Sequence, residues 1–242
     1  MKITIKNVLP GIALGLLGVL LFAGCSAPWA HNKSAKPGTR PTAQQLIAAA
    51  QKNFASVSSF HVIMQVQNPG KAEQGQVQIR NASGDVLMPD KVKAQATVIL
   101  SGQAVTVDLI SIGDSQYITD PITGQWRVIK GVLDPRTLTN PKTGIVSVFD
   151  KLQNVSQPTP DVVNGVQCWR INGQLDSKHI AFITGGGASK MLPTSACIGR
   201  ADALPYQVSV TGQAAPGDSD QTSRIFILSD YNKNVNISAP PL

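Results

Sequence analysis

Residues 91–109, KVKAQATVILSGQAVTVDL, alternate apolar and polar side chains along two runs separated by a short polar turn. The even-numbered positions are apolar in the first run, and the odd-numbered positions are apolar in the second. A period of two is typical of a strand with one buried and one solvated face, and the turn Ser101-Gly102-Gln103 predicts an antiparallel hairpin. The stretch therefore predicts an antiparallel sheet that is covered on one side.

The same period continues on both sides of this hairpin and predicts that most of the chain is β-structure. The expected strands are 60–66, 76–80, 92–100, 105–109, 115–119, 125–130, 166–173, 195–199, 205–211 and 222–229. Thr42 and Gln45 form a T-x-x-Q capping box, which predicts a helix that ends near Ser56. Apolar spacing over 145–152 and a capping residue at 176–177 predict two further short helical segments, 145–152 and 176–183.

The N-terminal residues have the layout of a secretory signal. Lysines precede an apolar run, and an Ala-Gly pair leads directly into Cys25. This ending resembles the lipobox of bacterial lipoproteins, in which diacylglycerol is attached to the cysteine and the chain is cut before it. An uncleaved membrane helix is the alternative, since the run is near the lower length limit for spanning. The prediction is a signal peptide over 1–24, lipid attachment at Cys25, a tether over 25–41 and a single domain over 42–242.

Charge and composition exclude one class of partner. The chain has a formal net charge of +7, 14% charged residues and 5% aromatic residues, and no basic run is interleaved with aromatics. A nucleic-acid partner is therefore not expected. For an exported, lipid-anchored chain we expect a place on the extracytoplasmic face of the cell membrane, next to anionic lipids.

The residues that carry chemistry do not predict an enzyme. His31, His61 and His179 stand at no metal-ligand spacing, and no G-x-S-x-G elbow is present. The spacing does not support a Ser-His-Asp set on His179, so the histidines of the domain are interpreted as ordinary surface or strand residues. The GGGASK stretch at 185–190 lacks the spacing of a phosphate loop and is interpreted as a mobile loop. No cofactor, metal or catalytic residue is expected.

Cys168 and Cys197 are an even pair in a chain with an export signal. Cys168 lies in the strand expected at 166–173, and Cys197 lies in the next expected strand. Consecutive antiparallel strands are often neighbours, so the two side chains can face each other across the pair and form a disulfide. Two buried free thiols are the alternative.

Aliphatic side chains are abundant on the expected sheet and helices. A curved sheet folded over helices can leave an apolar space between the two layers, and such a space suits acyl chains. The residues expected to line it are Phe54, Val62, Met64, Val98, Val107, Leu109, Val148, Phe149 and Leu152. Composition does not separate such a cavity from a simple packed core, so both interpretations stay open.

Several motifs, taken in order, resemble those of the LppX/LprAFG lipoproteins of mycobacteria and their relatives. The lipobox, the first helix and the antiparallel series come in the family's order. The more specific motifs are the turn Asn140-Pro141-Lys142-Thr143-Gly144, the strand opening Val163-Asn164-Gly165-Val166 and the ending 228–241, LSDYNKNVNISAPP.

The resemblance implies an α+β fold, in which a curved antiparallel half-barrel carries helices on its concave face and encloses an apolar cavity, similar to the LolA and LolB carriers. It implies a membrane-anchored lipoprotein that binds acylated lipid or glycolipid and carries it across the cell envelope, with an envelope transporter as a candidate partner. The family has no catalytic residues to carry over. The alternative is a non-catalytic surface module that docks another envelope protein or polymer through an exposed patch and has a filled core.

Overall fold

The computed structural model describes residues 40–71, 77–131, 134–140, 144–186 and 189–242. The expected signal peptide, Cys25 and all but the last two residues of the expected tether lie outside these ranges. The described strands are β1 (Ser59–Gln67), β2 (Gln78–Leu87), β3 (Lys91–Leu100), β4 (Gln103–Ile112), β5 (Ser115–Thr119), β6 (Trp126–Ile129), β7 (Thr159–Val163), β8 (Val166–Asp176), β9 (Met191–Gly199), β10 (Pro205–Thr211) and β11 (Ser223–Ser229). The helices are α1 (Ala43–Phe54), α2 (Pro135–Thr139), the 3₁₀ helices η1 (Ile145–Lys151) and η2 (Ser177–Ile180), and α3 (Ala181–Thr184).

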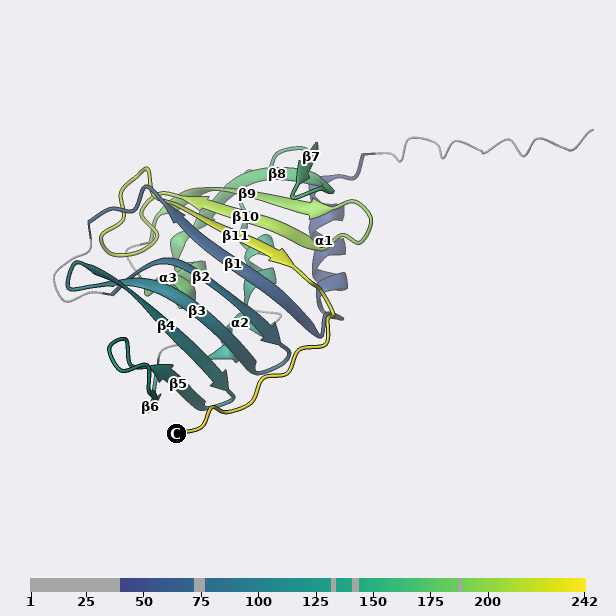
Figure 1. Cartoon of the computed structure of the whole chain (residues 1–242). Coiled ribbons are helices and arrows are strands. Elements are labelled where there is room, and N and C mark those ends of the chain that lie inside the picture. Colours follow the sequence, from purple (N-terminus) through teal and green to yellow (C-terminus); the bar gives the residue numbers. More distant parts are fainter. Residues whose placement is uncertain (1–39, 72–76, 132–133, 141–143, 187–188) are drawn as a thin grey trace, which may run out of the picture. The chain divides into compact units, whose positions relative to one another are not determined.

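The 11 strands form one open antiparallel sheet in the order β6-β5-β4-β3-β2-β1-β11-β10-β9-β8-β7. Figure 1 shows that this sheet is curved and that the helices lie on one side of it. We call the side that the helices cover the inner face of the sheet. Within the described ranges, no helix combines the length and the apolarity needed to cross a membrane.

The predicted hairpin and the predicted capping box are both confirmed. β3 and β4 pair along their whole length, with Val98 opposite Val105. At the start of α1, the Gln45 backbone N–H donates to the Thr42 hydroxyl, and the Thr42 N–H donates to the Gln45 side-chain oxygen. These local signals act within a few residues, so they need no tertiary context.

Several elements differ from the expectation. The strand expected at 76–80, of which position 76 lies outside the described residues, is β2, and it continues to Leu87. The small and polar residues over 81–84 are held as strand by β1 on one side and β3 on the other. The segment expected as a helix over 145–152 is the 3₁₀ helix η1, a form common in such short pieces. β7 and α2 are not predicted by the alternation. α2 has a typical helix start, with an Asp134 cap followed by Pro135.

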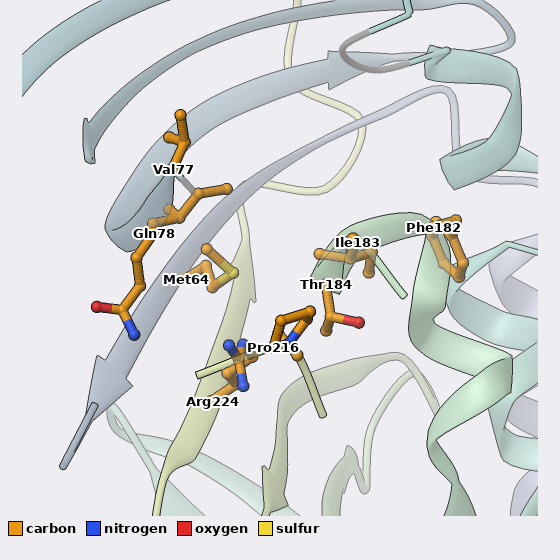
Figure 2. Close-up of a pocket in the computed structure, with 11 residues that line it drawn as sticks. Met64, Val77, Gln78, Phe182, Ile183, Thr184, Pro216 and Arg224 are labelled. Atoms are coloured by element: carbon orange, nitrogen blue, oxygen red, sulfur yellow. The ribbon is translucent and has the colours of Figure 1, made fainter. Parts of the chain in front are cut away.

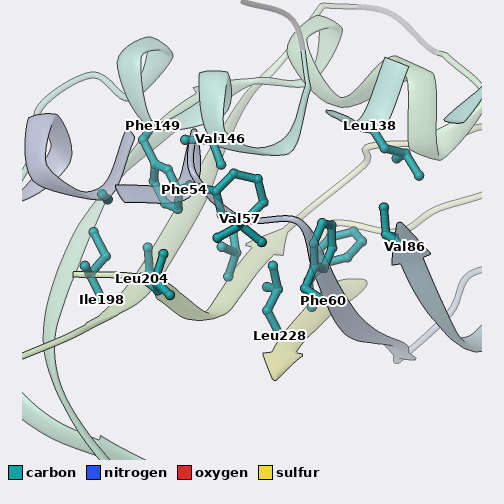
Figure 3. Close-up of a cluster of buried hydrophobic side chains, with 14 of the residues drawn as sticks. Phe54, Val57, Phe60, Val86, Leu138, Val146, Phe149, Ile198, Leu204 and Leu228 are labelled. Atoms are coloured by element: carbon teal, nitrogen blue, oxygen red, sulfur yellow. The ribbon is translucent and has the colours of Figure 1, made fainter. Parts of the chain in front are cut away.

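The main core lies between the helices and the inner face of the sheet (Figure 3). α1 buries Phe54, and Phe149 of η1 is 1% exposed beside it in the same cluster. The ring centroids of Phe54 and Phe60 lie 5.4 Å apart, and the Tyr231 ring contacts both. Tyr231 also donates a hydrogen bond to the Pro205 carbonyl, and burial raises the pKa of its hydroxyl well above the usual value.

The residues after β11 are tied to the start of β1. The Ser58 backbone N–H donates to Asn232 Oδ1 at 2.8 Å, and the Ser59 hydroxyl donates to the Lys233 carbonyl at 2.6 Å. Further along, Ile237 is 2% exposed. Figure 1 shows this yellow segment running along the ends of the strands. The ending that resembles the family therefore has a packing role at the centre of the sheet.

Cys168 on β8 and Cys197 on β9 form a disulfide, with Cα atoms 5.6 Å apart. The two residues are diagonal rather than directly opposed, because Cys168 pairs with Gly199 and Arg170 pairs with Cys197. A Cβ atom on Gly199 would lie 2.3 Å from Asp202 Oδ1 and 2.8 Å from Tyr206 Cε2, so glycine is needed there for the close approach of these two side chains. Since side chains alternate along a strand, the bond lies on the face opposite to Ile198, which packs in the main core. It braces the outer face of the sheet, away from the helices.

Thiol counting on denatured, unreduced protein taken from the cell envelope is expected to find no free thiol at Cys168 or Cys197. The bond closes a loop of 29 residues, for which the chain-entropy model gives about 3–4 kcal/mol of stabilisation. Reduction should lower the free energy of unfolding by that amount, and the Cys168→Ala/Cys197→Ala variant should match the reduced protein. Two reactive thiols in freshly isolated protein would contradict this expectation.

Candidate functional site

An apolar space, here called the central groove, lies between the inner face of the sheet and the short helices. It has a volume of about 190 Å³. Val62 and Phe226 are among the side chains that the sheet contributes, and α3 contributes Phe182 and Ile183. Every residue that lines it, except Ser83, is apolar. The groove can therefore hold hydrocarbon but offers very little to a polar ligand.

Small residues at the centre of the sheet create this space. Ala82 pairs with Ala96, and Gly84 pairs with Ala94, across β2 and β3. All four line the central groove. A Cβ atom placed on Gly84 would lie 2.5 Å from the Ala94 Cβ, so even alanine at that position would force the strands apart. Larger side chains at these positions would occupy the groove and convert it into packed core.

A second pocket, the polar pocket, adjoins the central groove and has a volume of about 400 Å³. The two spaces share the lining residues Met64, Ile79, Phe182 and Ile183. The polar pocket adds the side chains of Gln78, Thr184 and Arg224, which Figure 2 shows around the same space as Met64 and Pro216. The combined site is thus apolar along the sheet and polar at this end.

Arg224 brings a neutralised charge to the polar pocket. Its guanidinium makes two hydrogen bonds to the Asp218 carboxylate, and the Arg224 and Asp218 side chains are 7% and 0% exposed. The same carboxylate accepts the backbone N–H groups of Ala214 and Ala215, at 3.1 and 2.7 Å. A guanidinium has five N–H donors, so the pair leaves donors of Arg224 for a polar group in the pocket.

Gln78 also lines the polar pocket and has a buried amide group. The residue is 7% exposed, and its Nε2 donates to the Gly70 carbonyl at 3.3 Å. Its Oε1 is the one buried side-chain oxygen or nitrogen without a hydrogen-bond partner in the described part of the chain. Buried acceptors are normally paired, with water or a ligand where protein groups are missing.

A third space, the distal pocket, adjoins the central groove at its other end and has a volume of about 330 Å³. Phe54, Met88 and Val146 line it, and it shares Leu138 of α2 with the central groove. The three spaces follow β2 in order. Gln78 lines the polar pocket, and Val86 lines the central groove. Met88, which comes just after the end of β2, lines the distal pocket.

The segment that carries Phe182 and Ile183 is held by a charged cap. Asp176 precedes η2 and accepts hydrogen bonds from the Lys178 backbone N–H and from the Ser189 hydroxyl. The Ser189 hydroxyl, followed by the Lys178 N–H, lowers the pKa of Asp176 to about 2. The cap therefore stays ionised at neutral pH and fixes the start of the segment that covers the groove.

The structure distributes the nine expected cavity residues between pocket walls and packed core. Val62, Met64 and Leu109 line the central groove, and Phe54 lines the distal pocket. The other five line none of the three spaces. Phe149 is in the main core, Val148 is in a second buried cluster, and Leu152 packs against both clusters. Val98 is buried, and Val107 lies opposite Ala96 on the inner face of the sheet.

The small residues of the groove floor and α3 are not predicted from the sequence as parts of the site. Ala94 and Ala96 stand at inward positions of the quoted stretch, and a run of two alanines where valines flank them is a usable signal for missing volume. Phe182 and Ile183 carry no such signal, because their four-residue helix has no periodicity to detect.

The structure also brings together one group that the spacing does not indicate. His61 Nδ1 lies 2.7 Å from Asp85 Oδ1, and His61 Nε2 lies 3.0 Å from Ser83 Oγ. β1 and β2 are both interior strands, so their backbone N–H groups are used in the sheet and cannot form an oxyanion hole there. Ser83 is among the residues that line the central groove, but His61 and Asp85 line none of the three pockets. This arrangement is a hydrogen-bonded group of the outer face.

These features together define a class: half-barrel proteins with one curved antiparallel sheet and an apolar groove under its helices. The model of the LppX_LprAFG lipoprotein family matches residues 42–237. Because this match covers most of the chain, the protein belongs to the LppX_LprAFG family.

Named relatives and solved structures agree with this assignment. The chain is 23% identical over 238 residues to the lipoarabinomannan carrier protein LprG of Mycobacterium tuberculosis, covering 93% of this chain and 92% of that protein. The crystal structure of LprF from Mycobacterium bovis superposes with a TM-score of 0.66 at 19% identity, covering 82% of this chain and 96% of the other. The lipoprotein LppX of Mycobacterium tuberculosis gives 0.58 at 17% identity, over 81% and 98% of the two chains. The expected family and fold class are thereby confirmed.

Proposed function

We propose that this protein is a lipid-anchored carrier on the extracytoplasmic face of the cell membrane, which binds an acylated lipid or glycolipid and carries it across the envelope. The central groove carries this proposal, because its floor of Ala and Gly pairs leaves an apolar space where larger residues would have packed. Burial of an acyl chain at about 25 cal/mol per Å² would drive uptake. Membership of a family that includes a named glycolipid carrier supports it.

The order of the three spaces supports one orientation of the ligand. Acyl chains would lie along the central groove, and the headgroup would lie in the polar pocket beside Arg224 and Gln78. Because Asp218 neutralises Arg224, hydroxyl and ester oxygens suit this pocket as acceptors for the remaining N–H donors. Transfer requires no bond to be made or broken, so none of these residues has a catalytic role in the proposal.

Native mass spectrometry of the protein purified from its own membrane tests the proposal. The expected result is a population heavier than the acylated chain by the mass of one lipid. A surface docking module with no ligand would give a single mass. Protein that contains no lipid, and that takes up none from vesicles of its own membrane lipids, would overturn the carrier function.

The anchor is part of the same proposal, with a signal peptide over 1–24, a tether over 25–41 and one domain over 42–242. Cys25→Ala should remove acylation and leave the protein soluble or as an unprocessed precursor. One acyl chain holds a protein on a membrane only marginally, and two or three hold it stably, so a protein without any acyl chain has no stable anchor. Membrane fractionation with mass analysis of the N-terminal peptide measures this. Ser26→Ala, one residue on, should behave as wild type. A Cys25→Ala protein that is cut and retained normally would disprove the anchor.

A further inference from the structure

We propose that Leu138 sets the length of acyl chain that this protein accepts, by separating the central groove from a reserve space, the distal pocket. The inference rests on the lipid binding proposed above and adds a specificity-determining residue to it. Nothing else in the described ranges is shared by the linings of these two spaces. Figure 3 shows the Leu138 side chain of α2 pointing toward Val86 of β2, and both residues line the central groove.

The central groove is small, so its separation from the distal pocket limits how much of an acyl chain can be buried. Ligand pockets commonly measure about 300–1,000 Å³, whereas the central groove measures about 190 Å³. A long chain that starts at the polar pocket therefore reaches the end of the groove before it is fully buried. The distal pocket, of about 330 Å³, lies directly beyond Leu138 and has mostly apolar walls. Removal of that one side chain would join the two spaces into one.

The position of Leu138 is fixed from both ends of its helix. At the start of α2, Asp134 caps the Arg136 backbone N–H and also pairs with the Arg136 side chain. At the other end, the Thr139 hydroxyl donates to the Pro89 carbonyl, in the turn between β2 and β3. Leu138 is 8% exposed and belongs to the main core. It is therefore a fixed wall, and its size determines where the groove ends.

The test measures affinity against chain length. Delipidated protein is titrated with a series of saturated fatty acids of increasing length, by displacement of a fluorescent fatty acid. Affinity should rise about fourfold per added methylene while the chain still enters apolar space, and then stop rising. For Leu138→Ala this break should move to longer chains. For Leu138→Phe, which keeps the wall and enlarges it, the break should move to shorter chains.

Leu204→Ala is the matched control. Leu204 is also 8% exposed in the main core but lines none of the three spaces, so its variant reports the effect of a lost leucine alone and should keep the wild-type break. If wild type binds and the break is the same in both Leu138 variants, the role of Leu138 is overturned while the carrier function stands. If wild type binds no fatty acid of any length, the role of Leu138 is overturned, and the carrier function is decided separately by the uptake of lipid from vesicles. Where Leu138→Ala fails to fold, the shift in Leu138→Phe decides.

Discussion

Ala96→Trp is expected to remove bound lipid from the purified protein while leaving the fold intact. Ala96 lines the central groove from β3, opposite Ala82, and the indole would occupy the small space that the alanines leave. We expect lipid occupancy at least tenfold lower than in wild type. A tenfold drop corresponds to a loss of about 1.4 kcal/mol of binding free energy, which is the contribution of about two buried methylene groups. Native mass spectrometry measures the occupancy, and thermal unfolding checks the fold.

Gln95→Trp is the control for this variant. Gln95 is the preceding residue of β3 and is exposed on the outer face, where its Nε2 donates to Asp108 at 2.9 Å. It receives the same indole on the same strand without access to the groove, so it should retain lipid. Equal lipid content in the Ala96→Trp and Gln95→Trp proteins would show that the ligand does not lie in the central groove.

Arg224→Met is expected to destabilise the protein by about 3–5 kcal/mol, the usual cost of leaving one member of a buried ion pair alone. Without Arg224, the fully buried Asp218 carboxylate keeps only backbone N–H donors. Urea denaturation of protein prepared with and without Arg224 gives the difference in the free energy of unfolding. The Arg224→Met/Asp218→Ala double variant should lose less than the sum of the two single variants, because the unpaired charge is gone.

Lys233→Met provides the comparison for an exposed ion pair. Lys233 and Asp230 are in contact, but their side chains are 65% and 48% exposed, so this change should cost less than about 1 kcal/mol. If Arg224→Met and Lys233→Met lower the free energy of unfolding by the same amount, the Arg224–Asp218 ion pair does not stabilise the contact between β11 and the segment that carries Asp218.

The sheet was accessible from sequence because each strand carries its own evidence. A buried inner face and a wet outer face impose a period of two, which the stretch from Val92 to Leu109 shows without any knowledge of its neighbours. The strand β2 shows the limit of that evidence. Over 81–84 its sequence is Asn-Ala-Ser-Gly, and only pairing with β1 and β3 makes it a strand.

The site was less accessible, because it depends on which residues face each other. Val107 and Ala96 are opposed in the sheet, yet one lines no pocket and the other is part of the groove floor. That distinction depends on where α2 and α3 lie over the sheet, and those helices have five and four residues. For a similar reason the sequence predicts Phe149 as a cavity residue: an apolar helix face predicts burial, and a buried side chain belongs either to a packed core or to a cavity wall.

The pairing of β1 with β11 has a consequence for how the molecule is made. The first strand of the sheet lies next to the last one, so the centre of the sheet cannot be completed until synthesis has reached Ser229. Contacts between such distant parts of a chain slow folding, typically to milliseconds or seconds. A chain that stopped before β11 would have β1 to β6 in one piece and β7 to β10 in another, with no strand to join them. Such a molecule would expose β1 and β10 as two further unpaired edges besides β6 and β7, and unpaired edges invite aggregation.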